Sequence, residues 1–533
     1  MRARWWFRLA PVVLVAVGLL LGHAHAQREG YPAPRFPSYL KPPRGIDDLM
    51  PAARAAVRQI GGRTPLGLAK PGQRVLLVVP TRQDRMVVDA IIRAYRERGA
   101  QADFVLEHEA RGLTLEQARH EPLYTGEEGW REIGIFRREM LRYMPPDVRR
   151  ENEPRLFSPN EREGARRYLD RHPDYQVVFA GGGGRPTWRK VLGPHGDKFY
   201  GNWTYISFYD LLSRIPTYPA DVWRLTEERT IEPLAWAEEV RVTDPEGTDI
   251  RWRVSEPQAR EWARGAYLQG HLFMYPLQAG GRHPVSPGSP LPNTQVWLPP
   301  IVPDGAEGVI AGTSGHFGFF PHMRVHIAHG MIQRIEGGGK YGDVARLLLN
   351  HPLLKSVHYP MFPRPGYWYV QELGLGTNPK YFRPVAELKG NPFLPNSPER
   401  NAAGVLHWGF GAEVEDDPQG VWTKFAQEKG APASHAWHIH NVLPTYQVKI
   451  RGSGQWLTLI DRGRLAALDA FEARAVASRY GPPDELLRDD WRPDLPGITA
   501  PGDYMRDYAR DPWSYVKRQI EAIERGTYRY FAP

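Results

Sequence analysis

The 533-residue chain contains no cysteine. A disulfide framework is therefore excluded, and any bound metal ion must be held by histidine and carboxylate side chains instead of thiolates. Stability has to come from a buried core, and a chain of this length can bury a large one and form two or three domains.

The chain also lacks a block of lysine and arginine, although its formal net charge is +9. The basic residues are spread along the sequence, and no nucleic-acid-binding motif accompanies them. We therefore expect no nucleic acid partner.

No apolar run reaches the length of about 20 residues that a membrane-spanning helix needs. The run from Leu9 to Leu21 follows an arginine-rich start and leads to Ala24-His25-Ala26. This order is typical of a secretory signal peptide, here residues 1–26, and a retained anchor is the alternative. We expect an exported protein, periplasmic or extracellular, with no stable membrane insertion after cleavage.

Regular structure is expected to begin after residue 70, because residues 27–70 are rich in Pro, Gly and Arg and predict an irregular arm. Val75–Val79 predicts a buried strand, residues 84–97 have helical apolar spacing, and residues 102–106 predict a second strand. This β-α-β pattern indicates a parallel sheet and an α/β domain over residues 71–235.

Four consecutive glycines, Gly181 to Gly184, follow a third expected strand at residues 176–180. Neither the dinucleotide pattern nor the Walker pattern with its lysine follows them. We interpret this run as a flexible turn at a sheet edge and not as a nucleotide site.

The second half of the chain is expected to be rich in β-structure. Residues 240–254 alternate around Pro245-Glu246-Gly247, which predicts a hairpin. Short strand-like runs continue to about residue 465, and helical spacing returns in residues 466–533. The expected fold is α+β overall: an α/β domain, a β-rich metal-binding catalytic domain over residues 236–465, and a helical C-terminal extension.

The strongest local signal for chemistry is the sequence Trp437-His438-Ile439-His440. Residues two apart in a strand point to the same face, so His438 and His440 would present two imidazoles side by side. Such a pair predicts a two-point metal clamp, with two ordinary histidines as the alternative.

Other metal-binding side chains are expected in glycine-rich, apolar surroundings. His407 lies in Gly404 to Gly409, and Glu372 lies in Gln371 to Pro379, where a solvated acid has little reason to be. Glu307 follows a Pro-Asp-Gly turn and is either a second acidic ligand or a plain turn acid.

Taken in order, these motifs resemble the M29 family of thermophilic metalloaminopeptidases, also called aminopeptidase T or S. The resemblance covers roughly residues 70–465 and is most specific in Gly247-Thr248-Asp249 and in the Glu-Leu-Gly-Leu-Gly-Thr-Asn-Pro segment from Glu372. It implies a two-metal hydrolase with Glu307, Glu372, His407 and His438 as ligands, and it agrees with a homodimer.

The chain departs from the family at two positions. His440 stands where the family has an aspartate, and Val414 stands where it has a tyrosine. Two divalent ions bring four positive charges, whereas Glu307 and Glu372 supply two negative ones. A single ion held by Glu372, His407, His438 and His440 is therefore an alternative.

The same fold family includes an iron-dependent dioxygenase that opens dihydroxypyridine rings. Non-haem iron(II) is most often held by two histidines and one carboxylate, a set that Glu372, His438 and His440 provide. Trp408, Phe410 and Trp437 are then expected either to stack on a flat substrate or to belong to the core.

The first expectation for function is an exported metal-dependent hydrolase that cleaves a peptide or small amide through metal-activated water. Zinc, cobalt or manganese would be its cofactor, with Glu307 and His407 as acid/base groups. The alternative is a mononuclear non-haem iron(II) dioxygenase acting on an aromatic or heteroaromatic ring. A third hypothesis is that catalysis has been lost and the site only binds a metal ion or another ligand.

Overall fold

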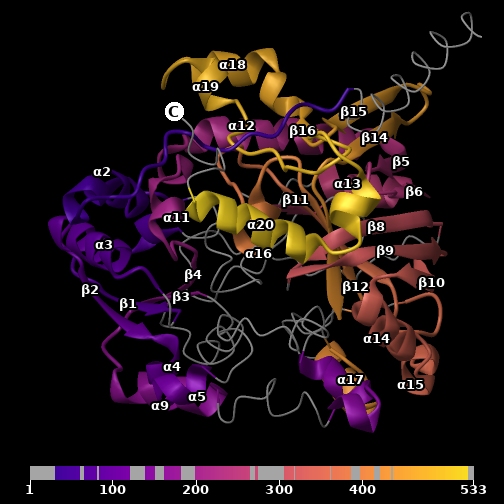
Figure 1. The fold of residues 1–533 in the computed structure, drawn as a ribbon, viewed down its shortest axis with the longest axis horizontal. Coiled ribbons are helices and arrows are strands. Elements are labelled where there is room, and N and C mark those ends of the chain that lie inside the picture. The colour runs from indigo at the N-terminus through magenta and orange to yellow at the C-terminus, as the bar shows by residue number, and fades with distance from the viewer. Residues whose placement is uncertain are drawn as a thin grey trace, which may run out of the picture.

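The chain, described here by a computed structural model, folds into a parallel sheet with helices and a larger region built on two antiparallel sheets (Figure 1). The α+β class expected from the sequence is therefore confirmed. The residues that the structure describes are 30–60, 65–80, 83–119, 138–149, 161–181, 199–263, 271–273, 305–316, 318–360, 362–385, 396–412, 421–433 and 436–525.

The first region is built on four parallel strands in the order β2-β1-β3-β4. Val75–Val79 of β1 is fully buried, as its unbroken apolar sequence predicts. The helix between β1 and β2 begins after Asp84, whose carboxylate accepts a hydrogen bond from the backbone N–H of Met86. The expected β-α-β unit and third strand are confirmed by β1 (Arg74–Val79), α3 (Arg85–Glu97), β2 (Gln101–Leu106) and β3 (Val177–Gly181). The fourth strand, β4 (Phe199–Trp203), was not expected.

The expectation of an irregular arm over residues 27–70 is wrong for its second half. Helix α2 (Ile46–Ala56) lies there and buries Leu49 and Met50 in the same core as β1. The helix contains Pro51, which is exposed. Because a proline usually ends a helix, it concealed the apolar spacing that buries one face of α2.

The second region contains an antiparallel sheet of eight strands in the order β10-β9-β8-β6-β5-β14-β15-β16. The expected hairpin is confirmed, since β5 pairs with β6 around a turn at residues 244–248. The strands are β5 (Ala237–Thr243), β6 (Asp249–Arg253), β8 (Glu307–Gly315), β9 (Gly318–Ala328), β10 (Met331–Gly337), β14 (Thr445–Ile450), β15 (Trp456–Asp461) and β16 (Arg464–Leu465).

A smaller antiparallel sheet, β13-β12-β11-β7, lies against strand β8. Close packing is achieved by glycine: a Cβ atom on Gly315 of β8 would lie 2.2 Å from the backbone oxygen of His438 in β13. The C-terminal end of β8, an inner strand of the large sheet, therefore lies directly against the strand that bears the histidine pair. The strands are β7 (His271–Phe273), β11 (Val370–Gly376), β12 (Leu406–Phe410) and β13 (Trp437–Asn441).

Helices surround these sheets and recur in the segment after residue 465 (Figure 1). None of the helices in the described ranges is long and apolar enough to cross a membrane. The expected signal peptide, residues 1–26, lies outside those ranges. The remaining helices are η1 (Leu66–Leu68), α4 (Glu107–Ala110), α5 (Leu115–Arg119), η2 (Arg138–Tyr143), α9 (Glu161–Arg171), α11 (Phe208–Leu212), η4 (Ile215–Thr217), α12 (Ala220–Ile231), η5 (Glu232–Trp236), α13 (Glu256–Ala263), α14 (Gly339–Leu349), α15 (Pro352–Ser356), α16 (Asn396–Asn401), α17 (Val421–Glu428), η8 (Ala466–Asp469), α18 (Phe471–Ala477), α19 (Pro483–Leu486), η9 (Met505–Ala509) and α20 (Pro512–Glu524).

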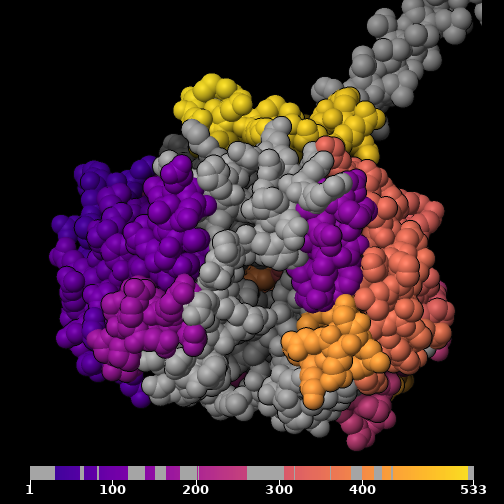
Figure 2. All heavy atoms as spheres, turned by 90° about the horizontal axis from the view of Figure 1, so that it is seen from below, coloured from indigo at the N-terminus to yellow at the C-terminus, as the bar shows by residue number. Residues whose placement is uncertain are grey.

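One segment of the first half of the chain crosses to the second region. The short helix η2 lies beside α17, and Figure 2 shows its purple atoms next to the orange atoms of that part. Tyr143 donates a hydrogen bond to the backbone oxygen of Gly430, and the carboxylate of Glu139 accepts one from the backbone N–H of Ala433. The two regions are thus held together by hydrogen bonds as well as by chain connection.

We predict that α2 contributes to the stability of the parallel-sheet region. Leu49→Ala removes a side chain that is 0% exposed, and it should lower the free energy of unfolding by about 2–5 kcal/mol. The matched control is Ile60→Ala, because Ile60 is 55% exposed and should lose little. Urea unfolding of both variants tests this, and equal effects would contradict the placement of α2 in the core.

Candidate metal centre

Three neighbouring strands bring four of the five predicted ligands to one face of the small sheet. His407 of β12 lies opposite His440 of β13, and Gly409 lies between Glu372 of β11 and His438 of β13. Because side chains alternate along a strand, all four side chains point to the same side. They are almost fully buried: His407, His438 and His440 are at most 1% exposed and Glu372 is 7% exposed.

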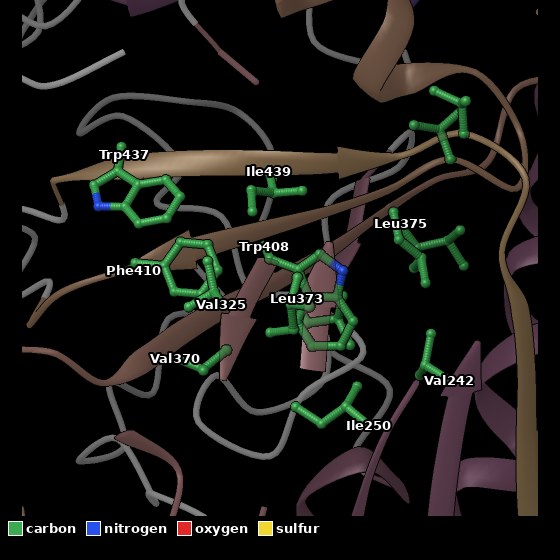
Figure 3. Packing of buried hydrophobic residues seen from close by; sticks show 14 of the residues in the cluster. Val242, Ile250, Val325, Val370, Leu373, Leu375, Trp408, Phe410, Trp437 and Ile439 are labelled. Carbon is green, nitrogen blue, oxygen red and sulfur yellow. The ribbon is translucent and has the colours of Figure 1, made fainter. Parts of the chain in front are cut away.

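The opposite face of the same strands belongs to the hydrophobic core (Figure 3). Phe410 stacks on Trp437 with ring centroids 4.4 Å apart, and the indole N–H of Trp408 donates to Asn441 at 2.7 Å. These aromatic rings cannot reach a substrate on the histidine face. The idea that they stack on a flat substrate is therefore wrong, and the core alternative is confirmed.

The carboxylate of Glu372 contacts one histidine of β12 and one histidine of β13. Its Oε1 lies 2.9 Å from Nε2 of His407, and its Oε2 lies 2.8 Å from Nε2 of His438. Burial raises the pKa of Glu372, but the two imidazoles outweigh burial and leave the pKa well below its usual value. Glu372 is therefore ionised, and a negative charge sits at the centre of the site.

Gly409 makes this arrangement sterically feasible. It occupies the middle strand between Glu372 and His438, where the two side chains meet. A Cβ atom here would lie 2.9 Å from His438 Nε2 and 3.1 Å from Glu372 Oε2. Any side chain at this position would therefore separate the carboxylate from the imidazole.

His440 is oriented by a second carboxylate that the sequence reading missed. Its Nδ1 lies 3.1 Å from Oε1 of Glu399, which also forms an ion pair with Arg383. Within the described part of the chain, Nε2 of His440 is buried and has no hydrogen-bonding partner. A carboxylate on one ring nitrogen and an open second nitrogen is the arrangement found for metal-binding histidines.

A fourth histidine, His316, completes the group of rings. It stacks on His438 with a centroid distance of 3.5 Å and an interplanar angle of 18°, and it lies 5.4 Å from His407 and 5.2 Å from His440. Burial, with neighbouring histidines, places the pKa of His316 well below its usual value. Burial also lowers the pKa of His407 to about 4, against the opposing effect of Glu372. Both rings are therefore neutral at neutral pH, the form that binds metal ions.

Glu307, the fifth predicted ligand, is not part of this group. It is the exposed first residue of β8, and its backbone lies opposite that of Arg251 in β6. The other end of β8, at Gly315, lies under His438. Strand length between the two ends is about 26 Å, at about 3.3 Å per residue. The prediction that Glu307 is a ligand or a base of this site is therefore wrong.

The side chains that are present fit the chemistry of one divalent ion. Ligand atoms about 2.1 Å from one ion and about 90° apart lie about 3 Å from each other, close to the separations of Glu372 from His407 and His438. The open Nε2 of His440 supplies a further donor. Among the described residues, however, no three such side chains are already closed around a single point. Binding would therefore need local movement of the rings.

Of the missed residues, only His316 had a signal in the sequence. It lies in Gly315-His316-Phe317-Gly318, and its glycine flanks resemble those that drew attention to His407. Glu399 and Arg400 lie in Asn396-Ser-Pro-Glu-Arg-Asn401, which has the composition of an exposed turn. Only the packing of α16 against β11 shows that both charged residues are buried.

Comparison with known proteins does not assign the chain to a family. No family model matches it, and no curated protein matches it. Among solved structures, the chain is similar to 2,5-dihydroxypyridine dioxygenase from Pseudomonas putida KT2440, with 14% sequence identity and a TM-score of 0.39 over 81% of this chain and 100% of that chain. A similarity this weak carries no functional argument, and membership of the M29 family stays a prediction.

We predict that Gly409→Ala disrupts the centre of the site. The added methyl group meets both Glu372 and His438, so it should cost about 1–3 kcal/mol of unfolding free energy and break their hydrogen bond. Gly45→Ala is the control, because a Cβ atom there meets nothing within 4 Å. Thermal unfolding compares the two variants. A Gly409→Ala protein as stable as wild type would show that this contact is absent.

Beneath the histidines, a buried glutamate makes stability depend on pH. Glu246 accepts hydrogen bonds from Thr313 and Tyr504, both at 2.7 Å, and burial raises its pKa to about 7. Its pKa in the unfolded chain is near 4.5. Between these two values the folded state holds a proton that the unfolded state releases, so stability should fall as pH rises from about 4.5 to 7.

We predict that Glu246→Gln removes part of this pH dependence. The glutamine stays uncharged, so the variant should lose less stability than wild type between pH 5 and pH 7.5, by on the order of 1–3 kcal/mol. Urea unfolding at both pH values measures the difference. Parallel pH profiles of the two proteins would mean that Glu246 is already ionised at pH 5.

Proposed function

We propose that the protein is an enzyme that uses a single divalent metal ion held by Glu372, His407, His438 and His440. The observation that carries this proposal is the open Nε2 of His440, because Glu399 binds the other nitrogen of that ring. A buried polar atom without a partner costs about 1–3 kcal/mol. A ligand for that nitrogen would remove the cost.

The charge of the site supports one ion better than two. Glu372 is ionised among the histidines, while the charge of Glu399 is balanced by Arg383. Glu307, which was expected to supply a second acid, lies at the far end of β8. Two divalent ions would therefore meet one available carboxylate, and we replace the two-metal hydrolase with a mononuclear site.

Among mononuclear enzymes, we favour an iron(II)-dependent oxygenase that cleaves an aromatic or heteroaromatic ring. Bound by histidines and one carboxylate, iron(II) would supply the reduction of oxygen. Glu399 keeps the Nδ1 proton of His440 in place, and Glu372 supplies the negative charge of the ligand set. His316, neutral and stacked on His438, is a further imidazole beside the proposed ligands.

Hydrolysis of a peptide or small amide is the second candidate, with zinc, cobalt or manganese as the ion. The same ligand set supports it, because histidines and a carboxylate also bind zinc, which can activate a bound water. His316 is a weak base, because burial places its pKa well below the usual value. His407 is less suited to this role than expected, since its Nε2 is bound to Glu372. Export through the signal peptide, a homodimer and a small-molecule or peptide substrate remain part of the proposal.

We predict that metal binding depends on the His440–Glu399 pair. His440→Ala should lose nearly all metal, and Glu399→Gln should weaken binding about 10–100-fold, because the ring loses its orienting partner. His326→Ala is the control, because His326 lies on β9 next to Glu336 and not at the site. Elemental analysis and calorimetry with iron(II), zinc and manganese measure stoichiometry and affinity.

The same preparations distinguish the two reactions. One iron per chain with oxygen consumption on aromatic substrates supports the oxygenase, and cleavage of aminoacyl anilides with zinc or manganese supports the hydrolase. A full equivalent of metal retained by both His440→Ala and Glu372→Ala would disprove the proposed ligand set.

A further inference from the structure

Arg400 is a buried cation without an anionic partner in the described part of the chain. Arg400 is 4% exposed, and its Nε and Nη2 atoms are buried and form no hydrogen bond with a described residue. Its third nitrogen, Nη1, donates to Nε2 of His316 at 3.3 Å. Burial lowers the pKa of Arg400 to about 9, so the guanidinium remains charged at neutral pH. Such a charge is expensive to bury unless an anion neutralises it.

A second buried arginine shows what a structural partner looks like here. Arg383 is 7% exposed and is paired with Glu399. Glu399 is the direct neighbour of Arg400 in sequence, yet its carboxylate contacts Arg383 and His440 instead. The acid next to Arg400 in sequence therefore neutralises the other arginine, and no described residue compensates the charge of Arg400.

The backbone around Arg400 is held tightly against strand β11. A Cβ atom on Gly376 would lie 2.6 Å from the backbone oxygen of Arg400 and 2.3 Å from that of Ala402. Asn378 also donates its backbone N–H to the oxygen of Asn401 at 3.3 Å. The guanidinium is thus carried by a segment that is fixed to the sheet bearing Glu372.

Arg400 also lies next to the histidine group. It contacts His316, which stacks on His438, and its positive charge contributes to the lowered pKa of His407. An anion that bound its open edge would therefore sit beside the rings proposed to hold the metal ion. This position suits one end of a substrate whose other end reacts at the centre.

We propose that Arg400 binds a carboxylate group of the substrate through its Nε and Nη2 atoms. These two atoms form one edge of the planar guanidinium, and two parallel N–H groups match the two oxygens of a carboxylate. The substrate is then a small aromatic or amide-containing carboxylic acid. This assignment of substrate class rests on the proposed function, whereas the anion site itself does not.

Binding of benzoate to the full-length protein tests the site, measured by calorimetry with and without metal and compared with the neutral analogue benzamide. Wild type should bind benzoate at least tenfold more tightly than benzamide. Arg400→Met should lose that preference, and because it removes an unpaired buried charge its Tm should be equal to or higher than that of wild type. Arg383→Met, which leaves Glu399 without its partner, should have a lower Tm. Arg251→Gln, at an exposed arginine of β6, is the control for net charge.

The outcomes separate this inference from the proposed function. Arg400-dependent benzoate binding by a protein that takes up none of the supplied metal supports the anion site and overturns the metal proposal. Metal binding without any preference for benzoate over benzamide overturns the anion site. Inorganic phosphate bound more tightly than benzoate would overturn the carboxylate assignment. A marked fall in Tm for Arg400→Met would show that Arg400 is a structural residue.

Discussion

The double contact of Glu372 with His407 and His438 is the constraint on which the rest of the site depends. A carboxylate this deeply buried is stable only when it is hydrogen-bonded, and here two imidazoles from two different strands contact its two oxygens. The contact spans β11, β12 and β13, so a shift of register in any of them would separate the partners. This contact also requires glycine at position 409, because a larger residue in the middle strand would meet Glu372 and His438.

Much of this site could be predicted because strand alternation is a strong local rule. The pattern His438-Ile439-His440 places both rings on one face whatever the tertiary fold. Local alternation does not predict which end of a strand lies at the site. Glu307 was a candidate ligand by its motif, but the other end of β8 lies under His438, and this depends on how the two sheets pack.

Burial of charged residues was the second feature that sequence reasoning could not supply. Glu399 and Arg400 lie in a short polar segment, and short polar segments are normally exposed. Their burial depends on Gly376, a residue of the Glu-Leu-Gly-Leu-Gly-Thr-Asn-Pro segment, which admits their backbone against β11. The role of the glycines in this segment is therefore evident only when their spatial neighbours are known. Helix α2 was missed for a different reason: it contains Pro51, a residue that usually ends a helix, although its apolar spacing is helical.

The buried polar groups of the molecule fall into two kinds, and the distinction supports the placement of the functional site. Lys380 is fully buried, but it contacts Asp490 at 3.2 Å and two backbone oxygens, and its role is structural. The Arg383–Glu399 pair is compensated in the same way. Nε2 of His440 and the open edge of Arg400 are not compensated within the described chain. Both residues neighbour His316, which lies 5.2 Å from His440 between ring centroids and 3.3 Å from Nη1 of Arg400. Because unmatched polar groups lower stability, ligands explain these two better than folding does.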